Sequence, residues 1–277
     1  MTHVMTHIAT TTGRIARPLE GRVALVTGST SGIGLGIARE LVRSGCHVML
    51  NGFGDPGTIQ AERDALQRQY GVEVIHDDAD MSDPHAIEAM LRHAAAALGP
   101  VDILVNNAGI QHVAPIETFP VGRWRAVQTI NLEAAFHTTR LVLAGMKERG
   151  YGRIINIASA HGLIASRFKS AYVAAKHGLV GLTKVTALEA AEHGVTCNAV
   201  CPGYVLTPLV ERQIDEQAAA HGIDRDAVIR DIMLAQQPTR RFVTIEEIAG
   251  TVTFLCGASA ASITGIALSV DGGWTAH

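Results

Sequence analysis

Three polar side chains in the second half of the chain have the types and spacing of a proton-transfer site. Tyr172 and Lys176 are four residues apart, so on a helix they lie one turn apart on one face. A tyrosine titrates at about 10 in isolation, and a neighbouring ammonium favours the phenolate. Ser159, thirteen residues before the tyrosine, ends an apolar run. We therefore expect Tyr172 to exchange a proton with an alcohol oxygen that Ser159 also hydrogen-bonds.

A second group of residues forms a glycine-rich turn between an apolar run and a segment with helical periodicity. Glycines let backbone N–H groups approach a pyrophosphate, and the following helix adds the positive end of its dipole. Any tight turn can contain glycine, so the signal comes from the position of this turn between a first strand and a first helix. The sequence therefore predicts a dinucleotide site around the phosphate-binding residues Gly28, Thr30, Ser31, Gly32, Ile33 and Gly34.

The end of the second predicted strand bears on which dinucleotide binds. An acidic side chain there holds the ribose 2′-hydroxyl of NAD, whereas a basic one holds the 2′-phosphate of NADP. Residues 50–55 read LNGFGD, and neither this segment nor the glycine-rich turn contains Lys or Arg. We expect NAD, with the ribose hydroxyl bound by Asn51 or by the backbone around Phe53. Asp80, after the third strand, is expected to accept a hydrogen bond from the adenine amine; its alternative role, a helix N-cap, better suits Ser82 or Asp83.

These residues are positioned by helical and strand-like segments that alternate along the chain. Glycine just past a helix end adopts the left-handed conformation, and nearly unbroken apolar runs are typical of strands buried on both faces of a parallel sheet. With further apolar runs at 23–27 and 265–270, seven strands result, which predicts a single Rossmann-type, doubly wound α/β domain with a seven-stranded parallel sheet. The glycines that precede the other five runs are Gly45, Gly71, Gly99, the pair Gly150 and Gly152, and Gly194.

The helical segments and the chain ends complete this outline. Helices are expected over 32–44, 58–70, 84–98, 121–148, 170–193 and 245–256. The charged helical region at about 208–235 is either a lid over the site or a solvated helical hairpin. Residues 1–19 have no acidic residue and no periodicity, so we expect a flexible leader, with a weak targeting peptide as the alternative, before a domain that spans 20–277.

Composition argues against several other classes of function. The 277 residues are 47% apolar and 18% charged, which is typical of a globular chain with a large core. The formal charge of −3 argues against nucleic-acid binding. The sequence contains no run of about 18 apolar residues, so we expect no membrane span. The cysteines lack metal-ligand spacing, so we expect no metal site: Cys46, Cys197, Cys201 and Cys256. Cys197 and Cys201, four apart on a predicted strand, are expected to be buried thiols rather than ligands, in a reducing, cytoplasmic setting.

Taken together, these motifs resemble the short-chain dehydrogenase/reductase family over about residues 20–277. The resemblance implies that Tyr172 is the general acid/base, that Lys176 binds the nicotinamide ribose and lowers the tyrosine pKa, and that Ser159 orients the substrate oxygen. It implies that Asn131 holds a water that links the lysine to solvent. It also implies a homotetramer through the helices at 121–148 and 170–193 and the last strand. Further cofactor contacts implied by the resemblance are Met81, Asn107, Ala108, Gly109, Pro202, Val205 and Thr207.

Four polar residues fall where this family lines its substrate pocket: Gln111, His161, Lys169 and Gln237. A lysine among amide and imidazole donors suits a small carboxylate, because a buried anion needs a cation and filled hydrogen bonds. Taken singly, each also fits a solvated loop or surface residue. Together with the segments around them they resemble family members that oxidise (R)-3-hydroxybutyrate to acetoacetate with NAD. Two departures are Tyr204, where the resemblance leads us to expect tryptophan, and Gln236, where we expect lysine.

Other functions on the same fold remain open at this point. Another small secondary alcohol, polyol or hydroxy acid would fit the same catalytic group. A CoA-thioester reductase is disfavoured because no basic side chain marks a 2′-phosphate site. A non-catalytic NAD-binding sensor is disfavoured because the serine, tyrosine and lysine are all present.

Overall fold

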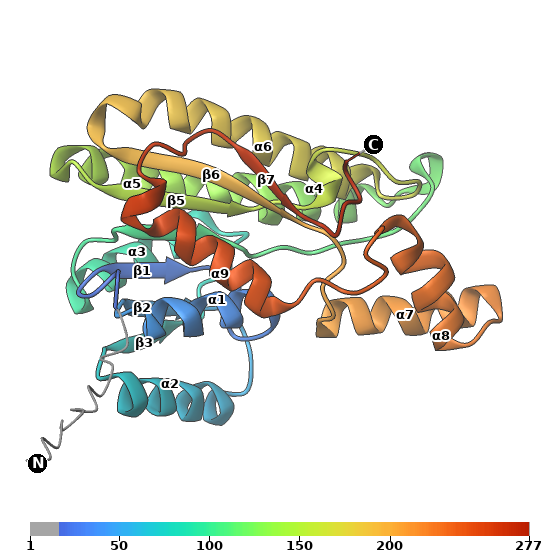
Figure 1. Ribbon diagram of the computed structural model, residues 1–277, viewed down its shortest axis with the longest axis horizontal. Coiled ribbons are helices and arrows are strands. Elements are labelled where there is room, and N and C mark those ends of the chain that lie inside the picture. Colours follow the sequence, from blue (N-terminus) through green and yellow to red (C-terminus); the bar gives the residue numbers. More distant parts are fainter. Residues whose placement is uncertain (1–16, 277) are drawn as a thin grey trace, which may run out of the picture.

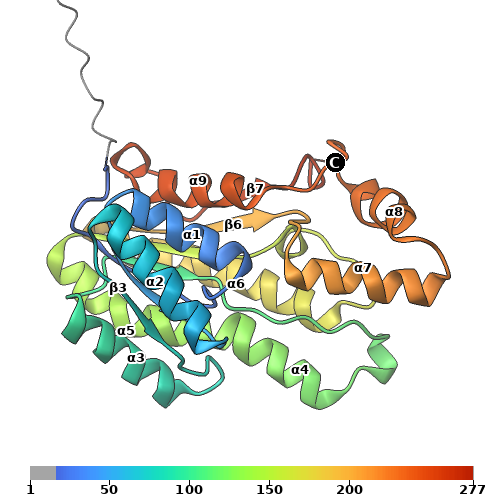
Figure 2. The same ribbon diagram turned by 90° about the horizontal axis from the view of Figure 1, so that it is seen from below.

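The computed structural model describes residues 17–276, in which one parallel sheet lies between two layers of helices (Figures 1 and 2). The strand order is β3-β2-β1-β4-β5-β6-β7, so the order of successive strands along the sheet reverses at the boundary between β1 and β4. The seven predicted strands are therefore present, as a doubly wound sheet. They are β1 (Val23–Val26), β2 (His47–Asn51), β3 (Val74–Asp77), β4 (Ile103–Asn106), β5 (Gly152–Ile157), β6 (Val195–Pro202) and β7 (Ala267–Val270).

The two faces of the sheet are covered by different helices. The helices α1 (Gly32–Arg43), α2 (Pro56–Tyr70) and α9 (Ile245–Cys256) bury apolar residues on one face. On the other face lie α3 (Pro84–Ala97), α5 (Ala134–Arg149) and α6 (Ser170–Ala190). Ala24 and Val26 contact the first layer, whereas Val23 and Leu25 contact the second, as the alternation of side chains along a strand requires. This two-sided burial explains the unbroken apolar runs in the sequence.

Helix boundaries follow local capping. Asp55 accepts a hydrogen bond from the N–H of Thr58 and Pro56 stands at the first helical position, so α2 begins two residues before the predicted start. Asp83 caps α3, which is the role weighed for it above. At the end of α5, Gly150 is left-handed with φ of 67°. Gly152 is instead a residue of β5, where a side chain would collide with Met146, so its predicted helix-ending role is wrong.

The predicted helix over 121–148 is interrupted. It consists of α4 (Val121–Gln128), one π-helical turn over Thr129–Glu133, and then α5. Single π turns inside helices are frequent at functional sites. This turn contains Asn131, whose side-chain amide accepts from the N–H and donates to the carbonyl of Ile110, at 2.8 and 2.9 Å. The extra residue in the turn thus lets a helix side chain fix the backbone of a loop at the site.

The predicted lid region folds as α7 (Pro208–His221), the short α8 (Arg225–Ala227), a π turn over Val228–Met233 and a 3₁₀ turn. Ile214, Val228 and Met233 form a small core of their own, which also contacts Tyr204. The hairpin projects from one end of the domain (Figure 1).

At the start of the chain, residues 1–16 of the predicted leader lie outside the described residues. Leu19 belongs to the buried core and Arg17 donates to the carbonyl of Tyr70, so the domain begins before residue 20. No helix among residues 17–276 is long and apolar enough to cross a membrane.

Candidate active site

A cavity of about 960 Å³ lies at the carboxyl edge of the sheet, where β1, β4, β5 and β6 end. Open α/β sheets bind ligands at this edge, next to the point where the strand order reverses. The glycine-rich turn and the loop after β4 form part of its wall. The start of α6, the segment after β6 and the C-terminal Trp274 form the rest. The cavity therefore joins the predicted nucleotide and catalytic groups in one space.

The structure brings the predicted catalytic residues together on one wall. Ser159 follows β5, and its Oγ accepts from the N–H of His161 at 3.1 Å. Tyr172 and Lys176 lie on one face of α6, with the ammonium 5.7 Å from the centroid of the tyrosine ring. Lys176 is buried and donates to the carbonyl of Ile157 at 2.7 Å, which ties α6 to the end of β5. The phenol and the serine hydroxyl thus face a common volume with the lysine behind them.

The electrostatics of this group differ from the expectation in one respect. Burial raises the pKa of Tyr172, and a hydrogen bond with Ser159 opposes that rise. Burial also lowers the pKa of Lys176 to about 8. The sequence led us to expect that the lysine lowers the tyrosine pKa, but in the protein alone burial is the larger effect on the phenol. A positively charged group bound beside the phenol would favour its ionised form.

The glycine-rich turn has the shape that a dinucleotide phosphate requires. Gly28 has φ of 61°, and a side chain there would come within 2.9 Å of the Cα of Ala108. A side chain on Gly34 would collide with the Gly28 carbonyl and with the amide of Asn107. Asn107 donates to the carbonyls of Thr27 and Gly28, both at 2.9 Å, and so holds the turn against the end of β4. The first turn of α1 follows this cradle, so the residues present fit the predicted phosphate group.

The structure places the side chain of Asn51, one of the two predicted ribose contacts, among the ends of the neighbouring strands. Its side chain is fully buried, accepts from the N–H of Gly28, and donates to the carbonyls of Asp77 and Ala79. These bonds use the amide to join the ends of three strands. The backbone around Phe53, the other predicted contact, is at the surface, and the Phe53 carbonyl accepts from Thr30 Oγ1 at 2.8 Å.

The remaining predicted cofactor residues divide into two groups. Asp80 is exposed and accepts from the N–H of Ser82, whereas the Met81 side chain is buried in the core. Neither lines the cavity, nor do Gly28, Thr30, Phe53 and Ala108. Those that do line it are Ser31, Gly32, Ile33, Gly34, Asn107, Gly109, Pro202, Val205 and Thr207.

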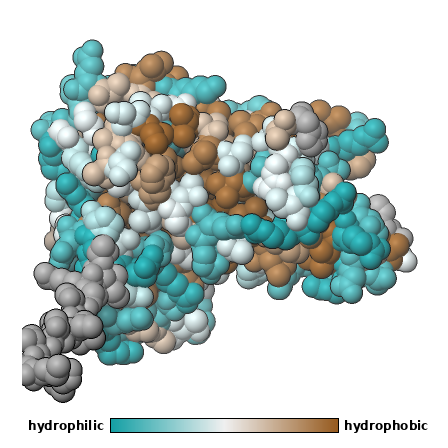
Figure 3. Space-filling view, in the orientation of Figure 1, coloured by the Kyte–Doolittle hydropathy of each residue, from teal (hydrophilic) through white to brown (hydrophobic). Residues whose placement is uncertain are grey.

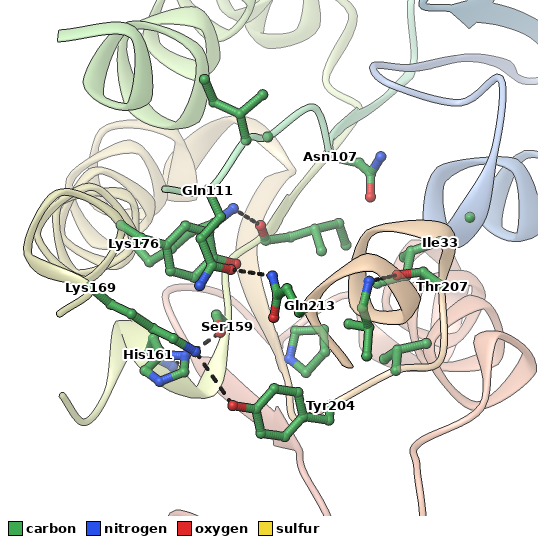
Figure 4. A pocket seen from close by; sticks show the side chains of 18 of the residues that line it. Ile33, Asn107, Gln111, Ser159, His161, Lys169, Lys176, Tyr204, Thr207 and Gln213 are labelled. Atoms are coloured by element: carbon green, nitrogen blue, oxygen red, sulfur yellow. Dashed lines mark hydrogen bonds between the residues drawn. The ribbon is translucent and has the colours of Figure 1, made fainter. Parts of the chain in front are cut away.

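The far end of the cavity contains a buried cation among hydrogen-bond donors (Figure 4). The Lys169 side chain is 9% exposed, and its Nζ donates to the hydroxyl of Tyr204 at 3.4 Å. Burial lowers the pKa of Lys169 to about 8, so the cation persists near neutral pH. Burial, with the neighbouring Lys169, lowers the pKa of His161 to about 3, which keeps the imidazole neutral. The Nε2 of Gln111 is buried with no hydrogen-bond partner among the described residues. These groups suit a small carboxylate.

Gln237 is not part of this wall. Its Oε1 accepts from the N–H of Tyr204 and its Nε2 donates to the carbonyl of Arg241 at 2.6 Å, so the amide fastens backbone. The amide that faces Gln111 belongs instead to Gln213 on α7, which donates to Gln111 Oε1 at 3.2 Å (Figure 4). Gln213 follows the cavity residue Val210 by three positions, and that helical spacing was the available signal.

Trp274 is a second site residue that the sequence analysis did not identify. Its ring stacks on Tyr204 with centroids 5.2 Å apart and meets the edge of His161 at 5.1 Å. It lies in a turn after β7 in which Asp271 accepts from the N–H groups of Gly273 and Thr275. Nothing in the local sequence indicates that this turn returns to the site.

The fold and this site define a class of enzyme, and comparison with known proteins agrees. A family model described as short chain dehydrogenase matches residues 22–218, and the chain belongs to that family. It is an oxidoreductase of the kind that uses a nicotinamide cofactor.

Two relatives bear the name D-beta-hydroxybutyrate dehydrogenase. The one from Rhizobium meliloti (strain 1021) is 54% identical over 256 residues, which cover 92% of this chain and 99% of the relative. The one from Cupriavidus necator is 54% identical over 259 residues, which cover 94% and 100%. Among solved structures, a tryptophan-for-phenylalanine variant of actinorhodin polyketide ketoreductase with NADPH has a TM-score of 0.86 and 39% identity, and the match covers 92% of this chain and 98% of that one.

Proposed function

We propose that this enzyme catalyses the reversible oxidation of (R)-3-hydroxybutyrate to acetoacetate with NAD. The observation that carries the proposal is the buried ammonium of Lys169, which has no salt bridge among the described side chains and lies in the same cavity as Tyr172 and Ser159. A cation in such a place favours a substrate that carries its own negative charge. The relatives named for this hydroxy acid support the choice of substrate.

The residues divide the work between the two ends of the substrate. Lys169 binds the carboxylate together with Gln111 Nε2, which has no hydrogen-bond partner among the described residues. Neutral His161, whose Nε2 bonds Ser166 Oγ at 2.8 Å, lines the same end of the cavity. This places the 3-hydroxyl toward Ser159, which hydrogen-bonds it, and Tyr172, which removes its proton in oxidation and returns one in reduction. The nicotinamide nucleotide, when bound, takes or gives the hydride. The ammonium of Lys176 lies beside the Tyr172 phenol, 5.7 Å from its ring centroid. The stacked rings of Tyr204 and Trp274 exclude water from the carboxylate end.

The preference for NAD is part of the same proposal. Its support is the lack of Lys and Arg over residues 27–34 and 50–55, so a 2′-phosphate would meet no cation from either segment. The ribose hydroxyl would bind the backbone near Phe53, because the side chain of Asn51 already forms hydrogen bonds with Gly28 and Asp77 at the strand ends. Gly32, Ile33 and Gly34 would hold the pyrophosphate at the start of α1.

An absorbance assay for NADH formation tests the function. The purified protein is offered (R)-3-hydroxybutyrate, its (S) enantiomer, 2-butanol and a polyol, each with NAD and with NADP. We expect turnover of the (R) acid with NAD and weak turnover of the neutral alcohols. Turnover with NADP alone, or equal turnover of 2-butanol and the acid, would refute the proposal.

We also propose a homotetramer built through α5, α6 and the edge strand β7. Large apolar side chains are exposed on the two helices, namely Phe136, Val185 and Leu188. Apolar residues are also prominent on the face shown in Figure 3. Within residues 17–276, strand β7 pairs with β6 alone, which leaves its other edge open in that part of the chain. Light scattering of the protein and of Leu188→Glu tests this: a tetramer that the substitution dissociates is expected, and a monomeric wild type would exclude it.

A further inference from the structure

Tyr204 is a residue of the cavity wall whose hydroxyl contacts Lys169. The backbone of Tyr204 is held from both sides by the segment after the hairpin. Its N–H donates to Gln237 Oε1, and its carbonyl accepts from the N–H of Val243 at 2.9 Å. The preceding Gly203 cannot carry a side chain without a collision with Gln237. The Cα of Tyr204 is therefore fixed relative to the end of β6.

The ring of Tyr204 is fixed as well. It stacks on Trp274 at a centroid distance of 5.2 Å and an interplanar angle of 15°. Trp274 in turn packs edge-on against His161, which packs edge-on against Tyr172 at 6.1 Å. A ring held in this way leaves one polar atom, the phenol oxygen, at a set position in the pocket.

That oxygen meets the ammonium of Lys169 at 3.4 Å, while the ammonium lies 5.5 Å from the centroid of the same ring. An ammonium has three N–H donors. The phenol oxygen is its hydrogen-bond partner among the described residues, so donors remain for a ligand in the cavity. A carboxylate in place of the phenol would neutralise the lysine and repel an anionic substrate. A neutral phenol holds the cation in place and leaves its charge for the ligand.

We propose that Tyr204 is a positioning residue that holds the Lys169 ammonium toward the substrate carboxylate through its hydroxyl, and so sets the affinity for the acid. This rests on the proposed function, because the ligand is the carboxylate of the hydroxy acid. Tyr204 acts through Lys169, so it affects binding of the charged end and not the transfer of the proton at Tyr172. Loss of its hydroxyl therefore raises KM and leaves kcat nearly unchanged.

The test compares Tyr204→Phe with the wild type and with Tyr151→Phe. The control variant, Tyr151→Phe, removes a hydroxyl that contacts the carbonyl of Cys256 at 3.4 Å, and Tyr151 does not line the cavity. With (R)-3-hydroxybutyrate, Tyr204→Phe is expected to raise KM by roughly 3- to 10-fold, as for the loss of one hydrogen bond of ordinary strength at 3.4 Å, with kcat within about twofold. Tyr204→Trp, which keeps a large ring against Trp274 without the phenol oxygen, is expected to raise KM similarly. Tyr151→Phe is expected to leave both constants unchanged.

A double-mutant cycle with Lys169→Met separates positioning from general damage. Adding Tyr204→Phe to Lys169→Met should raise KM no further, because the cation on which the hydroxyl acts is gone. An unchanged KM in Tyr204→Phe, a loss confined to kcat, or the same KM increase in the Lys169→Met background would each overturn the inference. These outcomes are distinct from failure of the proposed function, which is seen as absence of wild-type turnover of the acid and would overturn both.

Discussion

Replacing Lys169 with alanine should weaken binding of the hydroxy acid while leaving nucleotide binding intact. Burial lowers the pKa of Lys169 from 10.5 to about 8, so desolvation in the protein alone disfavours the ammonium by about 3 kcal/mol. A bound carboxylate supplies the missing partner. Truncating one member of a buried, hydrogen-bonded charge pair costs about 2–5 kcal/mol. Because Gln111 would still bind the carboxylate in the variant and His161 would still line the same end of the cavity, we expect a loss of binding free energy of about 2–3 kcal/mol, or a rise in KM of about 30- to 150-fold.

The assay measures KM for (R)-3-hydroxybutyrate at saturating NAD and the Kd of NADH by fluorescence. Lys169→Met is the matched variant, because it keeps a long apolar side chain and removes only the charge, and it should give a similar KM. Lys147→Ala, in the last turn of α5, is the control for loss of a positive charge and should change neither constant. Thermal melting checks that the variants are folded. A KM within about threefold of the wild type, or an equal loss of NADH affinity, would refute the carboxylate role.

Three further predictions follow from the site. Tyr172→Phe should lower kcat by roughly 10²- to 10⁴-fold in steady-state assays, with the Kd of NADH within about twofold, because only the proton donor is lost; a kcat near wild type would contradict this. Gly34→Ala should weaken NADH by at least about tenfold in fluorescence titration, because its Cβ would collide with the Gly28 carbonyl; unchanged affinity would argue against the cradle. Competitive inhibition by butyrate should weaken as pH rises through about 8, since the Lys169 cation is present below its pKa and lost above it, while the inhibitor stays ionised. Inhibition constants across that range, with Lys169→Met as a pH-independent reference, check the last point.

Features that depend on short stretches of chain were predictable. The seven strands follow from apolar runs, since a strand buried on both faces needs apolar residues at every position. The spacing of Tyr172 and Lys176 places them on one face of any helix, so their juxtaposition on α6 follows from helix geometry alone. The cradle for a phosphate could also be predicted, because glycine residues report backbone requirements directly.

Features that depend on which way a side chain faces could not be predicted from the sequence. Gln237 and Gln213 are amides on either side of the same hairpin, and the sequence does not show that one fastens Tyr204 while the other meets Gln111. Asn51 has the sequence position of a ribose contact, yet its side-chain amide donates hydrogen bonds to the carbonyls of Asp77 and Ala79, which are its neighbours in space. The break in the helix over 121–148 arises where Asn131 reaches the loop backbone at Ile110, a contact between distant parts of the chain.

The sequence by itself thus determined the class of fold, the glycine-rich turn between β1 and α1, and the grouping of Ser159, Tyr172 and Lys176 that we propose as catalytic, since each rests on periodicity or on local geometry. Only the tertiary structure decided the composition of the carboxylate end, where a helix start, a hairpin, a strand end and the C-terminal turn meet. Burial of Lys169, its contact with Tyr204 and the return of Trp274 all depend on the packing of segments far apart in the chain. The electrostatics of Tyr172 belong to the same category, because desolvation is a property of everything packed around a group and not of its neighbours in sequence.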